Sequence, residues 1–223
     1  MVQPIRSYVV RPGRITSLQK HALERLWDSY CLPFSDEEID LSALFGGRRK
    51  VIAEIGFGMG AATAELAHRM PETAFIGIEV FRAGIGKLLS EIERIELLNL
   101  RIIPHDGVEV FERMIPDASL SGIHLFFPDP WPKKRHHKRR LLQAPFVALA
   151  ARKLLPGGYL YAVTDWEDYA EEILAAFTAE PSLSNTYRGF ARPQEWRPQT
   201  KFERKGLDAG HAVREIYFTK NPD

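Results

Sequence analysis

The sequence is poor in cysteine, in long apolar runs and in net charge. Its 223 residues include one cysteine, Cys31, so no internal disulfide can form and a reducing compartment is expected. No apolar run approaches the roughly 20 residues that a membrane-spanning helix needs. Residues 1–16 carry three arginines without an apolar core, which argues against a secretory signal. We therefore expect a soluble, cytoplasmic protein that has no membrane partner.

The near-neutral total charge conceals an asymmetry along the chain. There are 30 basic and 29 acidic residues, which gives a formal charge of +1. Residues 133–140 read KKRHHKRR and hold six Lys/Arg and no acid, so elsewhere 24 basic residues face 29 acidic ones. A concentrated basic segment on a mildly acidic chain favours a polyanionic partner. A solvated charge run on a loop or helix face is the alternative.

The apolar pattern predicts an α/β fold. Hydrophobic residues make up 45% and charged residues 26%, a globular composition that excludes disorder, collagen and coiled coil. Near-continuous apolar runs predict strands covered on both faces. They lie at residues 51–55, 75–80, 100–104, 123–127 and 159–163, and residues 213–219 alternate like a further strand. Helical spacings fill the gaps, so we expect a doubly wound, mostly parallel sheet of six or seven strands with helices on both faces.

Two helices of this fold bear on the basic segment and on the domain organisation. An apolar stripe over residues 141–155 predicts a helix that begins beside the basic segment and stops at Pro156-Gly157-Gly158. Residues 166–177 predict the next helix. Residues 1–49 are expected to form an N-terminal arm and helical segment, and residues 50–223 the α/β domain.

The first predicted strand leads into a glycine-rich turn that contains Gly56 and Gly58. Glycines let the backbone turn tightly and approach a ligand, and the following helix N-terminus adds positive potential. The turn also satisfies the permissive dinucleotide-binding pattern, and it could be a strand–helix turn without a ligand. The glycines alone therefore leave the kind of ligand open.

Four acids stand at or just past the ends of the first four predicted strands: Glu54, Glu79, Asp106 and Asp129. In a doubly wound sheet these positions line one crevice at the carboxyl ends of the strands. Four carboxylates repel a pyrophosphate and suit a cationic ligand rich in hydroxyls, such as S-adenosylmethionine. Taken singly, each acid could instead be a helix N-cap or a solvated strand end.

The spacing suggests a task for three of these acids. Glu79 follows Gly60 by 19 residues, a distance suited to a carboxylate that accepts the ribose hydroxyls. Asp106 is placed for the adenine amino group and Glu54 for the methionine end.

The segment after the fourth strand carries a stiff loop. Three prolines in five residues, 128–132, surround Asp129 and Trp131. A fixed carboxylate beside the donor site, followed by cations, suits a nucleic-acid acceptor, although Trp131 could simply pack. The adjacent His136 and His137 have no cysteine or histidine partner at metal-ligand spacing, so no metal is expected.

These segments resemble the bacterial tRNA (guanine-N7)-methyltransferases. The resemblance rests on EIGFGMG at 54–60, GIEV at 77–80, FFPDPWPKKRHHKRRL at 126–141, TDW at 164–166, TKFERKG at 200–206 and RSYVVRPGR at 6–14. They follow the family's order over nearly the whole chain, and PDPWPKKRH is the most specific of them. The resemblance implies a seven-stranded Rossmann-like sheet of the class I methyltransferases. It also implies methyl transfer from S-adenosylmethionine to N7 of a variable-loop guanine in tRNA, giving 7-methylguanosine.

The resemblance also implies roles for particular residues, with Asp129 as the catalytic one. S-adenosylmethionine would be bound at Glu54, Gly56, Gly58, Glu79, Asp106 and Asp129. The substrate would be bound by Lys133, Asp165, Thr200, Lys201, Phe202 and Glu203. The tRNA would be held by Arg135, His136, His137, Lys138, Arg139 and Arg140. A monomer with tRNA as its partner is expected.

Methyl transfer to guanine N7 requires few catalytic groups from the protein. Guanine N7 already exposes a lone pair, so catalysis is mainly alignment and electrostatic stabilisation. Asp165 or Glu203 could accept hydrogen bonds from the N1–H and 2-amino edge of guanine, and Trp131 or Phe202 could stack on the base.

The residues argue against three rival functions. The PDPWPKKRH stretch argues against a methyltransferase for another RNA or for DNA. The intact Asp129 argues against a catalytically silent tRNA-binding module. The four acids, and the lack of a phosphate-clamping arginine in the glycine turn, argue against a nicotinamide oxidoreductase.

Overall fold

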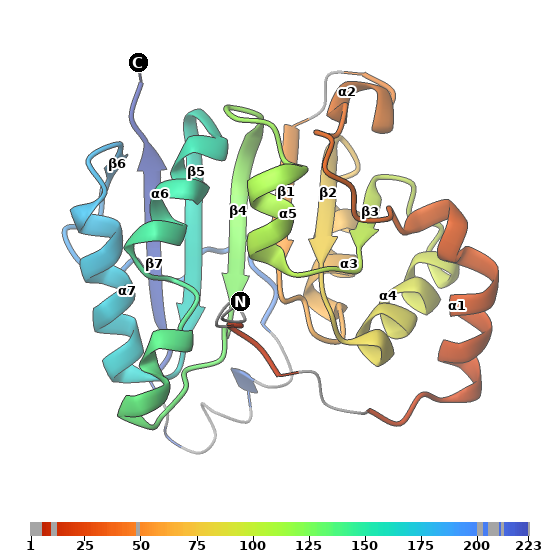
Figure 1. The fold of residues 1–223 in the computed structure, drawn as a ribbon, viewed down its shortest axis with the longest axis horizontal. Helices are drawn as coiled ribbons and strands as arrows, with labels where there is room; N and C mark the ends of the chain where they lie inside the picture. The colour runs from red at the N-terminus through yellow and green to blue at the C-terminus, as the bar shows by residue number, and fades with distance from the viewer. Residues whose placement is uncertain are drawn as a thin grey trace.

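The computed structural model describes residues 6–9, 13–47, 50–199, 203–204, 210 and 212–222, and its centre is a seven-stranded sheet (Figure 1). The strands are β1 (Lys50–Ile55), β2 (Thr73–Ile78), β3 (Leu100–Ile103), β4 (Leu120–Phe126), β5 (Leu154–Thr164), β6 (Leu183–Ser184) and β7 (Arg214–Lys220). Their order across the sheet is β3-β2-β1-β4-β5-β7-β6. The first five strands pair in parallel, and β7 runs antiparallel to β5 and β6.

Helices cover both faces of the sheet. They are α1 (Ser17–Tyr30), α2 (Leu41–Leu44), α3 (Ala61–Arg69), α4 (Arg82–Arg94), α5 (Gly107–Arg113), α6 (Ala144–Lys153) and α7 (Glu167–Ala179). One core cluster joins α5, α6 and α7 to the sheet, and the other joins α1, α3 and α4 to its opposite face. Figure 1 shows α1 and α4 beside the β3 edge and α7 beside β6. The predicted doubly wound, mostly parallel fold is confirmed.

The strands form where the sequence is apolar without alternation. Ala53, Ile76 and Ile123 on the three central parallel strands are fully buried. Such strands need cover on both faces, and the two helix layers supply it. The order reverses between β1 and β4, because β2 and β3 continue on one side and β5 on the other. Ligands of open α/β sheets bind at this switch point, outside the carboxyl ends of the strands.

The segment around the basic run differs from the prediction. Residues 134–139 form a short 3-10 helix, η1 (Lys134–Arg139), and α6 begins only at Ala144. The basic residues therefore do not start the long helix that we expected over residues 141–155. Pro145 in the first turn of α6 explains the later start, because proline fits the first helical turn and no interior position. At the other end, α6 stops at Lys153 and residues 156–158 fall within the span of β5.

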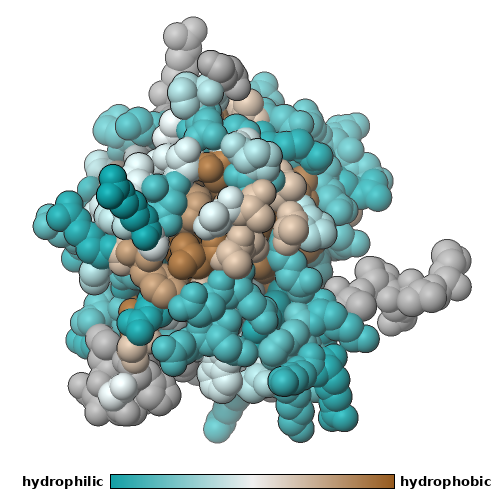
Figure 2. All heavy atoms as spheres, turned by 90° about the vertical axis from the view of Figure 1, so that its left-hand side faces the viewer, coloured by the Kyte–Doolittle hydropathy of each residue, from teal (hydrophilic) through white to brown (hydrophobic). Residues whose placement is uncertain are grey.

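The surface at the β6 and α7 edge carries an apolar patch surrounded by hydrophilic residues (Figure 2). Leu174, Ala176 and Phe190 are partly buried hydrophobic residues of this part of the chain.

Among the described residues, no helix has both the length and the apolar composition that a membrane span requires.

Candidate active site

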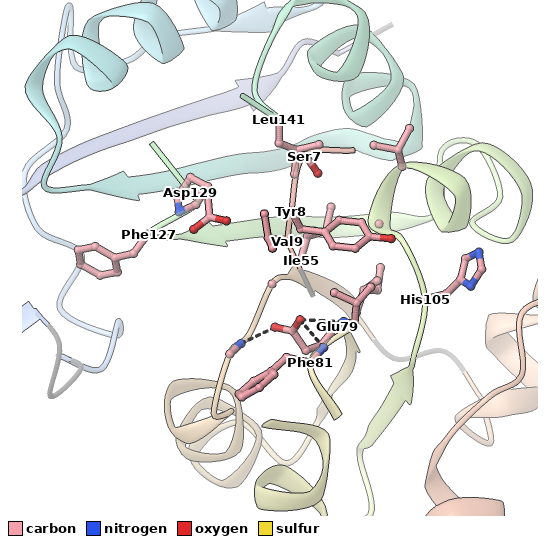
Figure 3. Close-up of a pocket in the computed structure, with 17 residues that line it drawn as sticks. Ser7, Tyr8, Val9, Ile55, Glu79, Phe81, His105, Phe127, Asp129 and Leu141 are labelled. Atoms are coloured by element: carbon pink, nitrogen blue, oxygen red, sulfur yellow. Dashed lines mark hydrogen bonds between the residues drawn. The ribbon is translucent and has the colours of Figure 1, made fainter. Parts of the chain in front are cut away.

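A cavity of about 390 Å³ lies at the carboxyl ends of the central strands, within the usual range for small-ligand sites. It is lined by the glycine turn after β1, by the residues that follow β2 and β3, and by the loop after β4. Figure 3 shows Glu79 and Asp129 among these residues, together with Tyr8 and Val9 of the N-terminal segment. The topology thus brings together residues that are up to 134 positions apart in the chain, Ser7 and Leu141.

Glu79 is fixed by the backbone of two elements. Its carboxylate accepts hydrogen bonds from the N–H groups of Val80 at 2.7 Å, Phe81 at 2.9 Å and Gly58 at 2.8 Å (dashed in Figure 3). The Gly58 contact ties the end of β2 to the glycine turn after β1. A carboxylate held in this way has a set direction, and its remaining lone pairs can accept from a bound diol.

The glycine turn depends on two glycines that are distant in sequence. Gly58 has a φ of 59°, a left-handed conformation that L side chains rarely adopt. A Cβ on Gly84 of α4 would lie 1.9 Å from the Gly58 carbonyl oxygen, so the turn packs directly onto that helix. At Gly56 and Gly58 an added Cβ would meet nothing within 4 Å, which agrees with their place on the cavity wall.

Glu54 is buried rather than exposed to the cavity. Its side chain accepts a hydrogen bond from the Thr63 hydroxyl of α3 at 2.8 Å, and the residue is 3% exposed. Burial raises the pKa of this carboxyl from its ordinary 4.5 to about 7, against the opposing hydrogen bond from Thr63. Its neighbour Ile55 lines the cavity. A negative charge at Glu54 would therefore act on a bound ligand through the residues that line the cavity, without contacting it.

Asp106 caps the helix that follows β3. Its carboxylate accepts from the backbone N–H of Val108 at 2.8 Å, which makes it the N-cap of α5. Its neighbours His105 and Gly107 line the cavity. Burial, followed by the negative charge of Asp106, raises the pKa of the Tyr8 phenol. Asp106 is therefore a helix N-cap, which was one of the two roles expected for it. Its carboxylate also lies beside Tyr8, which lines the cavity.

Asp129 lies in a loop whose backbone is bent on both sides. Phe127 and Trp131 have φ values of 54° and 47°, uncommon for residues other than glycine. The Phe127 N–H donates to the Val163 carbonyl of β5 at 2.7 Å, which anchors the start of the loop. Such conformations persist when the surroundings over-determine them, and they cluster at functional sites. The bends leave Asp129 facing the cavity.

The N-terminal segment crosses this site. The indole N–H of Trp131 donates to the Ser7 carbonyl at 3.0 Å, and Arg139 donates to the carbonyls of Arg6 and Tyr8, each at 2.9 Å. Ser7, Tyr8 and Val9 line the cavity. We call residues 6–9 the strap. The sequence marked this segment only as an arm, and its apolar–aromatic stretch between arginines was the signal that could have placed it at the site.

The basic residues separate into two kinds. Lys133, Lys134, Arg135 and Lys138 are exposed, and His136, His137 and Arg139 are partly buried. The side chain of Arg140 has no exposed surface, because it is enclosed by α7 and by residues 127–133, the loop after β4, which we call the acceptor loop. The structure therefore does not place Arg140 among the cations available to a phosphate.

The remaining predicted substrate residues lie beyond the cavity wall or outside the described residues. Asp165 is half-buried just past the end of β5. Thr200, Lys201 and Phe202 fall outside the described residues. Glu203 is 4% exposed and pairs with Arg197 at 2.6 Å, and Arg197 also pairs with Glu215 at 2.7 Å. The Glu203 carboxylate is therefore paired inside the protein, where it is almost inaccessible.

Residues 48–216 match the protein family described as "Putative methyltransferase". The tRNA (guanine-N(7)-)-methyltransferase of Nitrosomonas europaea is 52% identical over 217 residues, which are 97% of this chain and 97% of that protein. The protein of the same name from Bordetella parapertussis is 52% identical over 216 residues, 97% of this chain and 85% of the relative. The resemblance in the motifs is thus part of a likeness over the whole length.

Solved structures share the fold at much lower identity. The 16S rRNA methyltransferase KamB superposes with a TM-score of 0.61 and 17% identity, covering 83% of this chain and 95% of that chain. The aminoglycoside resistance methyltransferase NpmB1 gives 0.56 and 17%, covering 81% and 92%. At this identity the likeness supports the methyltransferase fold alone. The high identity to the named relatives over nearly the full length shows that the chain belongs to the tRNA (guanine-N7)-methyltransferase family.

Proposed function

We propose that this protein transfers the methyl group of S-adenosylmethionine to N7 of a variable-loop guanine in tRNA. The observation that carries the proposal is the cavity at the switch point, with Glu79 and Asp129 on its wall and exposed cations directly beyond. Family membership supports the same reaction, because the relatives are named for it. The product is 7-methylguanosine.

The donor fits the residues of the cavity. Glu79 is held with free lone pairs for the ribose diol, and Gly56 and Gly58 leave room for the ligand. S-adenosylmethionine supplies an electrophilic methyl on a cationic sulfur. The carboxylates of Glu54, Glu79 and Asp129 around this site favour a cation, as does the absence of an arginine from the glycine turn.

Asp129 is the proposed catalytic residue. It lies on the cavity wall in a bent loop that also leads to the basic residues, so it stands between donor and acceptor. As the methyl transfers, positive charge moves from sulfur to the purine ring, and no proton has to leave N7 first. A fixed carboxylate stabilises that charge without reorganising. Lys133 and Asp165 are proposed to contact the guanine or its nucleotide.

The exposed cations are proposed to hold the tRNA through its phosphates, which carry no base identity. We assign this role to Lys134, Arg135 and Lys138, which are exposed. The partly buried His136, His137 and Arg139 are proposed to contribute less. A tRNA tertiary pair at N7 would require extrusion of the base. We further propose that the protein acts as a monomer in the cytoplasm, where its single buried cysteine stays reduced.

The test is to incubate the protein with unmodified tRNA and labelled S-adenosylmethionine, then digest the tRNA and identify the nucleoside. Label in 7-methylguanosine at one variable-loop position is expected. Label in a different nucleoside would replace the proposal with another RNA methyltransferase. Tight tRNA binding without any label would favour a silent binding module, and light scattering of the same sample measures the oligomeric state.

A further inference from the structure

The side chain of Arg140 connects the acceptor loop to α7. Its Nε donates to the Pro130 carbonyl at 2.8 Å, and its Nη2 donates to the Asp168 carboxylate at 3.0 and 3.1 Å. Its Nη1 forms an ion pair with Glu172 at 2.7 Å. The guanidinium carbon also lies 4.8 Å from the centre of the Tyr169 ring. One guanidinium therefore reaches a loop carbonyl, two acids and an aromatic ring.

This arrangement leaves Arg140 no surface for a phosphate. The side chain is 0% exposed, whereas its two acidic partners are about half exposed. The acids and His137 present three ligand atoms within 4.8 Å of one another, the kind of cluster that can attract a cation. Here the protein supplies that cation itself, because the Arg140 guanidinium pairs with both carboxylates.

The bonded carbonyl is one residue from Asp129. The loop is anchored before Asp129 by the Phe127–Val163 hydrogen bond and after it by the Arg140–Pro130 hydrogen bond. The backbone adopts left-handed φ values at the first anchor, Phe127, and just past the second, at Trp131, and these values are unfavourable unless held. The rigid fork of arginine can hold a carbonyl and two carboxylates in one fixed geometry, and a lysine cannot.

We propose that Arg140 is a positioning residue that fixes the Asp129 loop against α7, and that it does not contact tRNA. The inference rests on the role proposed above for Asp129. A carboxylate displaced by about 1 Å from its productive position costs roughly 100-fold in rate. Loss of Arg140 should therefore lower the rate of methyl transfer within the bound complex.

The experiment compares Arg140→Met, Arg140→Lys and the control Arg135→Met, an exposed cation of the same run. Two quantities are measured with unmodified tRNA: the single-turnover rate at saturating tRNA and S-adenosylmethionine, and the dependence of tRNA affinity on salt. We expect Arg140→Met to lower the saturating rate by about 10- to 100-fold, with an unchanged salt slope. Arg140→Lys should recover only part of the rate. Arg135→Met, which removes an exposed cation, should flatten the slope by about 0.7–0.9, one phosphate contact.

Each rate is divided by the concentration of sites that bind S-adenosylmethionine. A variant that is only partly unfolded then keeps the parent rate per site. A parent rate for Arg140→Met, or a slope flattened like that of Arg135→Met, would overturn the proposal. If Arg140→Met does not fold, the double variant Asp168→Asn/Glu172→Gln decides, because it retains every cation. A lower saturating rate of this double variant supports positioning, and a parent rate overturns it.

Asp129→Asn is measured in parallel. A parent enzyme that makes no 7-methylguanosine refutes the proposed function instead, and a fully active Asp129→Asn refutes the role of Asp129.

Discussion

The guanidinium of Arg139 lies over the indole of Trp131, with its carbon 3.8 Å from the ring centre. The same arginine donates to two carbonyls of the strap, and Trp131 donates to a third. One face of Trp131 is therefore already covered by a cation, which weakens it as a stacking platform for a guanine. The contact joins the basic run, the acceptor loop and the N-terminal strap over one cavity.

Replacing Arg139 should loosen the strap. Arg139→Ala removes two hydrogen bonds, each contributing about 1 kcal/mol, and a cation–π contact. S-adenosylmethionine should then dissociate about tenfold faster, because Ser7, Tyr8 and Val9 line its cavity. Stopped-flow displacement of the bound donor measures the rate. Lys138→Ala, at an exposed neighbour in the same run, is the control and should leave donor dissociation unchanged. Equal rates for Arg139→Ala and parent would mean that the strap does not retain the donor.

Loss of the Glu79 carboxylate should weaken the donor site. Glu79→Ala removes the acceptor proposed for the ribose diol and releases the N–H of Gly58. A charge-assisted hydrogen bond contributes about 1.5–3 kcal/mol, so the Kd for S-adenosylmethionine should rise by roughly 10- to 150-fold. Isothermal titration measures it, with the exposed Glu72→Ala as control. An unchanged Kd in a folded Glu79→Ala protein would remove Glu79 from the donor site.

Asp129 should matter for turnover and little for binding. Asp129→Ala should lower the single-turnover rate by about 100- to 1,000-fold, the usual cost of losing an electrostatic stabiliser in a closed site. The affinity for tRNA should stay close to the parent value, because the exposed cations are untouched. Rapid-quench kinetics and filter binding give the two numbers. A near-parent rate would assign the chemistry to another group.

The exposed cations should account for the salt dependence of tRNA binding. Replacing Lys134, Arg135 and Lys138 by alanine removes up to three phosphate contacts. The plot of log affinity against log salt should flatten by up to roughly two units, at about 0.7 per contact. Titrations at several salt concentrations measure the slope, and the site of methylation and the affinity for S-adenosylmethionine should not change. Parallel lines for parent and variant would show that the run is only a solvated charge cluster.

Glu54 should impose a pH dependence on stability. Its pKa is raised from 4.5 to about 7 in the folded protein, so the folded state holds this proton more tightly than the unfolded chain. The free energy of unfolding should therefore fall as the pH rises from about 4.5 to about 7, and this contribution should then level off. Urea denaturation of parent and Glu54→Gln across this range isolates the contribution. The difference between the two proteins should change with pH in that window, and a constant difference would contradict the burial argument.

Much of the site could be predicted from local sequence. Apolar runs such as residues 51–55 form strands wherever they are buried on both faces, and the residue that follows a parallel strand lies at the ligand edge of the sheet. Glu79 and Asp129 reached the cavity for that reason. The glycine turn was predictable because Gly58 adopts a left-handed φ that few other residues tolerate.

Local sequence did not reveal which side chains pair with each other in the folded protein. The six lysines and arginines within residues 133–140 looked alike as cations, yet Arg140 is enclosed by Asp168 and Glu172 of a helix that follows later in the chain. Glu203 looked like a candidate reader of guanine, and Arg197 holds it inside. Periodicity also placed the start of α6 too early, because an apolar stripe does not reveal where the first helical turn forms.

The sequence by itself therefore determined the strand and helix order, the sheet edge that carries the ligand site and the chemistry of its acids. These follow from hydrophobic periodicity and backbone preference, which act over a few residues. Only the tertiary structure decided which cations remain exposed, which acids stay available and that the strap closes over the cavity. Those outcomes depend on desolvation and on pairing between residues such as Arg139 and Tyr8, which are far apart in the chain and adjacent only after folding.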